Sequence, residues 1–545
     1  MDDPLFIRAA QQIIKHPFDP YGFPIVWYAH QLPMSRVNQN PPLASYYAAL
    51  LGLVAGWSER ALHLGFILPA LVVILGTYRL ARRFTKKPFL AAAATLLAPG
   101  FFVSATGVMC DTMMLALWIL AVIFWMEGLD EPVKPIALAV SSLLIAACAL
   151  TKYFGVSLIP LLLAYSVIQK RRIGSWVGFL LIPVFLLGAY ELGTHALYGR
   201  GLLSDGLFYT AGTRKSDWEG ISLFGHVLVG LAFAGGCTLP ALTFVPFLWS
   251  RKQILAGGVL GMLLGFSLFN GWVNLDTTRT RTDWIVFHWA LVNSELLVCI
   301  AGGVAVWALA AADFWKRRSA ASVLLLLWVV GTFCYAILVN WVVNARSLLA
   351  LIPAAAILIA RRFDEIQISS ARWRRLAFVA PLVVSGAVSL GVASGDMKLA
   401  NSSRKMANYI HQKTLSESGA VEFQGHWGFQ YYMESFGARP LEQGEYGSHP
   451  GDLIVFPVNN TNVLELSEKT IVQSVTDLEV HSWVATMSPQ LGAGFYSSIW
   501  GPLPFAFGRV PNERYYILRV GAAREKAEQP LKERAPVGNL AKENE

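Results

Sequence analysis

The feature that most constrains this chain is a series of apolar segments joined by short connections. Crossing the ~30 Å hydrocarbon layer of a bilayer takes about 20 residues of helix, and the shorter segments need the help of neighbouring helices. Lipid offers backbone amides no water, so such segments must be helical. We expect twelve spans, at about 60–80, 89–107, 111–127, 136–151, 154–169, 175–193, 223–249, 254–273, 288–312, 321–341, 346–360 and 376–394.

The composition supports a polytopic membrane protein and argues against a soluble enzyme. Of the 545 residues, 55% are hydrophobic and only 14% are charged. The five cysteines all lie in apolar runs, which indicates small buried hydrophobic side chains and neither a disulfide framework nor a zinc site. The net charge of +9 does not indicate a nucleic-acid partner, because the basic residues cluster in short loops between apolar segments.

These basic clusters predict the topology. Loops rich in Lys and Arg stay on the cytoplasmic side of a membrane. The clusters lie near residues 79–87, 170–172, 251–252, 316–318 and 361–375. The N-terminus, the loops at about 194–222, 274–287 and 342–346, and the tail after 395 therefore face outward. We expect an integral protein of the bacterial inner membrane with this side in the periplasm or exterior. Nothing precedes Asp2 to carry it across, so we expect the natural start to lie upstream, with a further helix.

Four parts follow from this topology. Residues 1–59 form an outer loop, with interfacial helices at 5–16 and 42–57 and an irregular loop at 17–33 between them. Residues 60–394 form the transmembrane domain. Residues 395–525 are mixed polar, with a helix near 397–414 and strand-like runs at 420–423, 452–456 and 515–518, which indicates a small outer α/β or α+β domain. Residues 526–545 are expected to be a disordered tail.

The charged residues on the outer side are the candidates for chemistry. Asp2 and Asp3 form an adjacent pair of carboxylates, and Asp111 lies at the outer turn between two spans. Lys152 and Arg346 lie at outer ends of other spans. Each has an ordinary alternative: a solvated chain end for the pair, a favourable helix N-terminal charge for Asp111, and interfacial anchoring for the two cations.

Further outer residues are candidates for lining a pocket: Asn40, Tyr46, Glu191 and Glu295. The two glutamates lie near the outer ends of apolar spans, where an ionisable group is costly unless it is paired or functional. His195 and His288 could neighbour them, but such scattered ligands are weak evidence for a metal site, so we expect no metal and no cofactor. In the tail, the run at 425–432 contains aromatics that would either contact an acceptor or fill an ordinary core.

Transfer of a sugar from a polyprenyl-phosphate donor is one reaction that would use an outward carboxylate, outward cations and a large lipid-facing body. The lipid lies in the bilayer while its phosphate and sugar lie at the interface. A carboxylate would take the proton from the acceptor hydroxyl, and Lys or Arg would stabilise the charge of the departing phosphate.

The order of several short motifs resembles a known family. The run from Asp2 to Ala10, the Asn40-Pro41-Pro42-Leu43 helix start and the entry to the next span at 57–62 resemble the opening of the GT-C glycosyltransferases related to protein O-mannosyltransferases and the lipid A aminoarabinose transferase. Asp111, Lys152 and the stretch 346–353 match later landmarks in order. The resemblance implies thirteen spans, one more than the twelve expected here.

The resemblance also implies roles for individual residues. Asp2 would be the catalytic base with Asp3 in support, and Asp111 would orient the base or acceptor. The family often has Arg two residues after the acidic pair and a basic residue before Pro-Pro, where this chain has Leu5 and Asn40. The donor phosphate contacts would then come from Arg8, Lys152 or Arg346.

The sequence thus predicts an inverting transferase that moves a sugar from a polyprenyl-phosphate donor to a hydroxyl of a protein, lipid or glycan acceptor, the inversion being implied by the resemblance. Two alternatives stay open. A multi-span transporter would suit twelve spans, but the chain has no repeated halves and its conspicuous charges gather at one face. A non-catalytic lipid-binding relative of the same fold is the other alternative.

Overall fold

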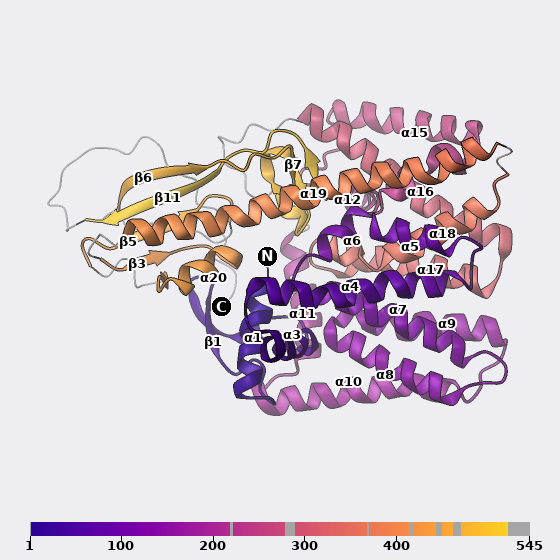
Figure 1. The fold of residues 1–545 in the computed structure, drawn as a ribbon, viewed down its shortest axis with the longest axis horizontal. Helices are drawn as coiled ribbons and strands as arrows, with labels where there is room; N and C mark the ends of the chain where they lie inside the picture. The colour runs from indigo at the N-terminus through magenta and orange to yellow at the C-terminus, as the bar shows by residue number, and fades with distance from the viewer. Residues whose placement is uncertain are drawn as a thin grey trace.

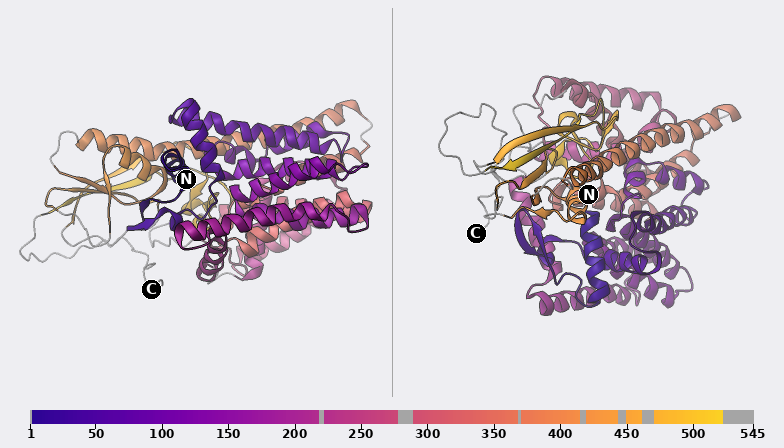
Figure 2. Two further views of the ribbon diagram at one scale, coloured as in Figure 1. Left: turned by 90° about the horizontal axis from the view of Figure 1, so that it is seen from below. Right: turned by 60° about the vertical axis from the view of Figure 1, so that its left-hand side comes forward.

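A bundle of long helices forms one end of the molecule, and a strand-containing domain forms the other (Figure 1). The computed structural model describes residues 2–217, 222–277, 289–367, 370–414, 419–442, 449–460 and 470–521. The N-terminal segment lies between the two ends (Figures 1 and 2). This arrangement places the first residues of the chain where the bundle meets the strand domain.

Within the described residues, eight helical stretches are long and apolar enough to cross a membrane. They are Glu59–Ala81 (α4), Cys110–Gly128 (α7), Tyr153–Lys170 (η1 and α9), Val177–Tyr198 (α10), Arg251–Phe269 (α15), Trp289–Arg317 (α16), Ala320–Val339 (α17 and η2) and Ala371–Thr414 (α19). Shorter helices complete the bundle: α5 (Pro88–Leu96), α6 (Pro99–Ser104), α8 (Pro135–Thr151), α11 (Leu202–Asp217), α12 (Leu223–Cys237), α13 (Pro240–Thr243), α14 (Val245–Leu248) and α18 (Leu351–Asp364). The predicted polytopic helical architecture is confirmed.

Prolines explain why some predicted spans are broken helices. The expected span at 89–107 is divided where Pro99 begins α6, and the expected span at 223–249 is divided where Pro240 begins α13. Proline lacks a backbone N–H and disfavours helical geometry in the residue before it. The hydropathy of these segments is continuous, but their helices are not.

Two helices of the bundle approach each other closely through glycines. A β-carbon added at Gly235 of α12 or at Gly303 of α16 would collide with the backbone of the other helix. Contact between backbones without intervening side chains is the usual function of small residues in membrane helix packing. Aromatic packing fills the bundle elsewhere, as where Trp118 stacks on Phe154 with ring centroids 5.2 Å apart.

Helix α19 joins the bundle to the strand domain without a break (Figures 1 and 2). It contains both the last predicted span and the predicted helix at 397–414. The expected domain boundary between 394 and 395 therefore falls inside a continuous helix. Its last turns belong to the core of the strand domain, where Met406 and Ile410 are buried with Phe429 of α20 (Trp427–Ser435).

The strand domain contains a five-stranded sheet in the order β4-β3-β5-β11-β6. Its strands are β3 (Val421–Phe423), β4 (Arg439–Pro440), β5 (Leu453–Pro457), β6 (Thr470–Leu478) and β11 (Glu513–Val520). β3 runs parallel to β4 and β5, whereas β11 is antiparallel to β5 and β6. The short strands β7 (Val484–Ala485), β8 (Met487–Ser488), β9 (Ala493–Gly494) and β10 (Ala506–Phe507) pair separately. The predicted strands and the small C-terminal α/β domain are confirmed, and the expected tail at 526–545 lies outside the described residues.

The N-terminal segment contains both predicted interfacial helices, α1 (Asp3–Lys15) and α3 (Leu43–Ala55). Between them lie the hairpin of β1 (Pro24–Trp27) and β2 (His30–Pro33) and the short helix α2 (Met34–Val37). Tyr28 and Ala29 form the turn with φ of 55° and 61°, the geometry that matches the twist of a two-residue hairpin. The hairpin lies in the segment 17–33, for which the sequence predicts an irregular loop. Its strands were not predicted because they are short and contain proline.

Candidate functional site

Four charged side chains from separate segments meet at one end of the bundle: Asp2, Asp111, Lys152 and Arg346. Lys152 Nζ lies 2.5 Å from Asp111 Oδ1. Both terminal guanidinium nitrogens of Arg346 donate to Asp2 Oδ2 at 3.2 Å, and one of them lies 4.0 Å from Asp111 Oδ2. We name these four side chains the charged cluster.

The ends of secondary structures position the charged cluster. Asp2 precedes α1, Asp111 lies in the first turn of α7, Lys152 follows the last residue of α8, and Arg346 begins the short helix η3 (Arg346–Leu348). Asp3 Oδ1 accepts a hydrogen bond of 2.7 Å from the backbone N–H of Val108, just before α7. Asp3 therefore fixes α1 against the entry of α7 and leaves Asp2 to face Arg346.

The side chains of the charged cluster are largely buried, so their pairing matters for the stability of the fold. Asp111 is 1% exposed, and the Lys152 and Arg346 side chains are 19% and 17% exposed. A buried charge left unpaired costs several kcal/mol, so each of these side chains depends on its partners. The Arg346 Nε is buried and meets no hydrogen-bond acceptor among the described residues. A buried donor of this kind can be satisfied by a water molecule or by an anionic group.

The strand domain covers Arg346 from its other side. The guanidinium lies 5.7 Å from the centre of the Tyr496 ring, within the range of a cation–π contact. The Tyr496 hydroxyl donates to Asp396 Oδ2 at 2.8 Å, and Thr486 donates to Asp396 Oδ1 at 2.7 Å. Neither Tyr496 nor Asp396 is among the candidates that the sequence offers. Only the tertiary fold brings them beside Arg346, and a lone Tyr in a tail gives no signal.

Other predicted site residues have different neighbours. Asn40 adjoins the charged cluster, because its side-chain oxygen lies 3.7 Å from the sulfur of Cys110. Tyr46 donates instead to the backbone oxygen of Pro17 at 2.6 Å. Arg8 pairs with Glu434 of α20 and not with the charged cluster.

The two predicted glutamates serve as acceptors for nearby backbone and hydroxyl groups. Glu191 accepts from the Ser204 hydroxyl at 2.5 Å and from the Leu203 N–H at 2.9 Å, at the start of α11. Glu295 accepts from the backbone N–H of Phe507 at 3.0 Å. These contacts join segments of the fold, and neither glutamate contacts the charged cluster. In the parts of the chain that the structure describes, no group of three or more His, Cys, Asp or Glu residues could hold a metal ion; His288 lies outside them.

The basic loops lie at the opposite end of the bundle from the charged cluster (Figure 1). There they pair with acidic residues of adjacent helices. Arg83 contacts Asp130 at 2.7 Å, and Arg317 contacts Glu365 at 2.9 Å. The bundle therefore separates a basic end, rich in ion pairs, from an end that carries the charged cluster and the strand domain.

Sequence comparison identifies a related family over part of the chain. Residues 39–190 match the model of the family described as dolichyl-phosphate-mannose-protein mannosyltransferase. The match includes Asp111 and Lys152 and confirms the predicted resemblance to the GT-C glycosyltransferases. The chain is thus an integral membrane protein related to a family of glycosyltransferases. No curated protein matches this chain.

Two solved structures resemble the chain at low sequence identity. ArnT from Cupriavidus metallidurans bound to undecaprenyl phosphate is 15% identical, with 84% of this chain and 88% of that chain covered and a TM-score of 0.42. The archaeal oligosaccharyltransferase AglB from Archaeoglobus fulgidus, in complex with an inhibitory peptide and a dolichol-phosphate, is 12% identical. In that case 84% of this chain and 65% of the other are covered, with a TM-score of 0.43.

Proposed function

We propose that the protein transfers a sugar from a polyprenyl-phosphate donor to a hydroxyl of an acceptor, with inversion at the anomeric carbon and without a metal ion. The single observation that carries this proposal is the charged cluster. Asp2 supplies a carboxylate, and Arg346 and Lys152 supply two cations at the end of a membrane bundle. The family match over residues 39–190 supports the same chemistry.

Asp2 is the proposed general base. Its carboxylate is 28% exposed, so an acceptor hydroxyl can reach it, whereas Asp111 is enclosed at 1%. The acceptor oxygen loses its proton to Asp2 and forms the new bond to the anomeric carbon. The bond from that carbon to the phosphate oxygen breaks, and polyprenyl phosphate leaves with its additional negative charge.

Arg346 and Lys152 are the proposed phosphate contacts. The unsatisfied Nε of Arg346 offers a donor that the carboxylates do not use. Positioned cations stabilise charge that develops on a leaving phosphate, and they act most strongly where water is excluded. Asp111 holds Lys152 through the 2.5 Å contact, so its proposed role is to position this cation. We assign Arg8 no phosphate role, because Glu434 already pairs with it.

The proposed orientation places the charged cluster and the strand domain outside the cytoplasm. The ion-paired basic loops at the far end of the bundle support this orientation through the positive-inside rule. In a bacterium the site would face the periplasm or the exterior.

A label-transfer assay tests the proposal. Membranes that contain the protein are incubated with radiolabelled polyprenyl-phosphate sugar, and label is followed into lipid, glycan and protein fractions. Asp2→Asn should lower the rate by about 10²–10⁴-fold, the usual contribution of a general base. The control Asp477→Asn changes a partly exposed carboxylate of the strand domain that pairs with Arg514. Absence of transfer by every wild-type preparation would contradict the enzyme assignment, and normal transfer by Asp2→Asn would contradict the site.

A further inference from the structure

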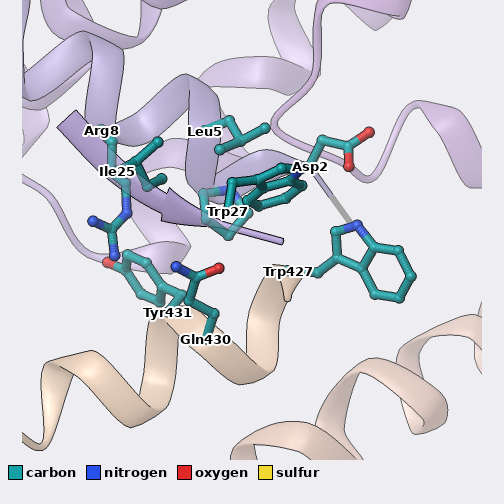
Figure 3. Close-up of a pocket in the computed structure, with 9 residues that line it drawn as sticks. Asp2, Leu5, Arg8, Ile25, Trp27, Trp427, Gln430 and Tyr431 are labelled. Atoms are coloured by element: carbon teal, nitrogen blue, oxygen red, sulfur yellow. The ribbon is translucent and has the colours of Figure 1, made fainter. Parts of the chain in front are cut away.

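A small pocket lies beside Asp2, between the N-terminal segment and the strand domain (Figure 3). Helix α1, strand β1 and helix α20 form its walls. The side chains around it are Asp2, Pro4, Leu5, Arg8, Ile25, Trp27, Trp427, Gln430 and Tyr431. Three of these nine side chains are large aromatics, and they come from segments some 400 positions apart in the chain.

Trp427 is held in the pocket at a conformational cost. Its φ of 61° lies in the left-handed region, which a bulky side chain rarely adopts and which costs on the order of 1 kcal/mol or more. The residue begins α20 and is half-buried, and its ring meets the buried Trp500 ring edge-on with centroids 6.4 Å apart. Strained backbone conformations cluster at binding and active sites, so the strain at Trp427 points to a function for its ring in this pocket.

Trp27 is fixed more firmly than Trp427. Its indole stacks on the His426 ring with centroids 4.3 Å apart and an interplanar angle of 26°. Gln430 is fixed as well, because its amide donates to the Val26 carbonyl at 3.2 Å and to Glu434 at 2.8 Å. The pocket wall is therefore organised in advance, with aromatic surface and polar groups in fixed positions.

This combination suits one class of small molecule. A sugar ring presents C–H groups that pack on the face of an aromatic side chain, and its hydroxyls exchange hydrogen bonds with carboxylate, guanidinium and amide groups at its edge. The pocket offers both kinds of surface. Binding sites of this type combine apolar walls with a few placed polar groups.

Asp2 connects the pocket to the charged cluster. It lines the pocket and also accepts both hydrogen bonds from Arg346, whereas Arg346 and Lys152 are not among the residues that line the pocket. A molecule in the pocket therefore meets the proposed base without displacing the proposed phosphate contacts. We propose that the pocket is the acceptor subsite and that the acceptor presents a sugar ring, held against Trp427 and Trp27 with a hydroxyl at Asp2; this inference rests on the proposed function.

Saturation-transfer NMR tests the proposal without requiring turnover. The full chain in lipid nanodiscs is mixed with millimolar methyl glucoside, methyl galactoside, methyl mannoside or methyl N-acetylglucosaminide, or with a neutral peptide that contains Ser and Thr. We expect at least one glycoside to receive saturation on its ring protons, and we expect the peptide to receive none. Saturation of the peptide alone, or of no probe at all, would overturn the saccharide assignment.

Trp427→Gly provides the decisive variant. Glycine adopts a φ of 61° without strain, and this relief opposes the loss of the contact with Trp500, so the variant should stay folded while its glycoside signal falls at least five-fold. Trp427→Leu should lose the signal as well. The control Trp483→Leu alters a Trp that is 73% exposed outside the pocket and should keep the signal. An unchanged signal in Trp427→Gly, or an equal loss in Trp483→Leu, would reject the pocket.

Label transfer measured on the same nanodiscs separates the two proposals. Transfer to a membrane acceptor without any glycoside signal would reject the saccharide subsite and leave the proposed function standing. Glycoside signal without transfer from any polyprenyl-phosphate sugar would reject the proposed function and the acceptor role together.

Discussion

Arg346 donates both terminal nitrogens of its guanidinium to a single carboxylate oxygen of Asp2, at 3.2 Å each. The same guanidinium lies 4.0 Å from Asp111 and faces the Tyr496 ring. One cation therefore connects the start of the chain, the start of α7 and the strand domain. Since the carboxylates already occupy two of its nitrogens, an incoming phosphate would share this cation with Asp2 and leave the carboxylate less tightly held, ready to accept a proton.

Replacement of Arg346 tests this shared role. Arg346→Lys keeps the charge but loses the planar set of donors, so it cannot bind Asp2 and a phosphate in the same way. We expect the transfer rate to fall about 10²-fold or more, a loss typical when a positioned donor to a developing charge is removed. Arg79→Lys is the matched control, because Arg79 pairs with Glu127 at the other end of the bundle. Equal transfer rates in the two variants would contradict the role of Arg346.

The buried pair of Lys152 and Asp111 predicts a difference between single and double variants. Asp111→Asn leaves the Lys152 ammonium buried beside a neutral amide, and breaking a buried pair in this way costs about 3–5 kcal/mol. We expect the unfolding temperature in detergent to fall clearly. The double variant Asp111→Asn with Lys152→Met removes both charges and should recover most of the loss, while label transfer stays low. A double variant no more stable than Asp111→Asn would show that the pair is not the source of the cost.

Much of the charged cluster could be predicted from the sequence, for a physical reason. Hydropathy and loop charge place Asp2, Asp111, Lys152 and Arg346 at the same end of a bundle, the end opposite the basic loops. The distances between them could not be predicted, because they depend on how α1 docks on α7.

The contacts that could not be predicted from the sequence join residues that lie far apart in the chain. Tyr496 reaches Arg346 only because α19 continues from the bundle into the strand domain and carries Asp396, which holds the Tyr496 hydroxyl. The Arg8 side chain has a basic character that suits phosphate, but α20 brings Glu434 against it. In both cases the partner lies more than a hundred positions away, where local pattern gives no information.

Glu513 of β11 predicts a pH dependence of stability in the strand domain. Its carboxyl is buried, and this burial raises its pKa from 4.5 to about 7, although the Asn459 amide donates to it at 2.9 Å. In the unfolded chain the group ionises near 4.5, so the folded domain is favoured below that pH and loses stability as the pH rises to about 7, by at most about 3 kcal/mol.

The variant Glu513→Gln should remove this dependence. It is expected to unfold at a higher temperature than the wild type at pH 8 and at a similar temperature at pH 4.5, followed by thermal unfolding of the full chain. Glu479→Gln is the control, since Glu479 is 57% exposed and should change little. Identical pH profiles for wild type and Glu513→Gln would show that Glu513 is ionised in the folded domain at no cost.

His426 predicts a pH dependence of the opposite sign. Burial against Trp27 lowers its pKa from 6.5 to about 4, so the folded protein keeps the imidazole neutral while the unfolded chain protonates it. Between pH 6.5 and 4 the unfolded chain binds the additional proton, and stability is therefore lost as the pH falls through this window.

His426→Phe keeps a ring to stack on Trp27 without a titrating group, so it should lose less stability than the wild type between pH 7 and 4.5. The two variants Glu513→Gln and His426→Phe must be compared separately with the wild type, because their effects overlap in pH and partly cancel in the native chain. If His426→Phe loses as much stability on acidification as the wild type, the buried imidazole does not titrate as its surroundings require.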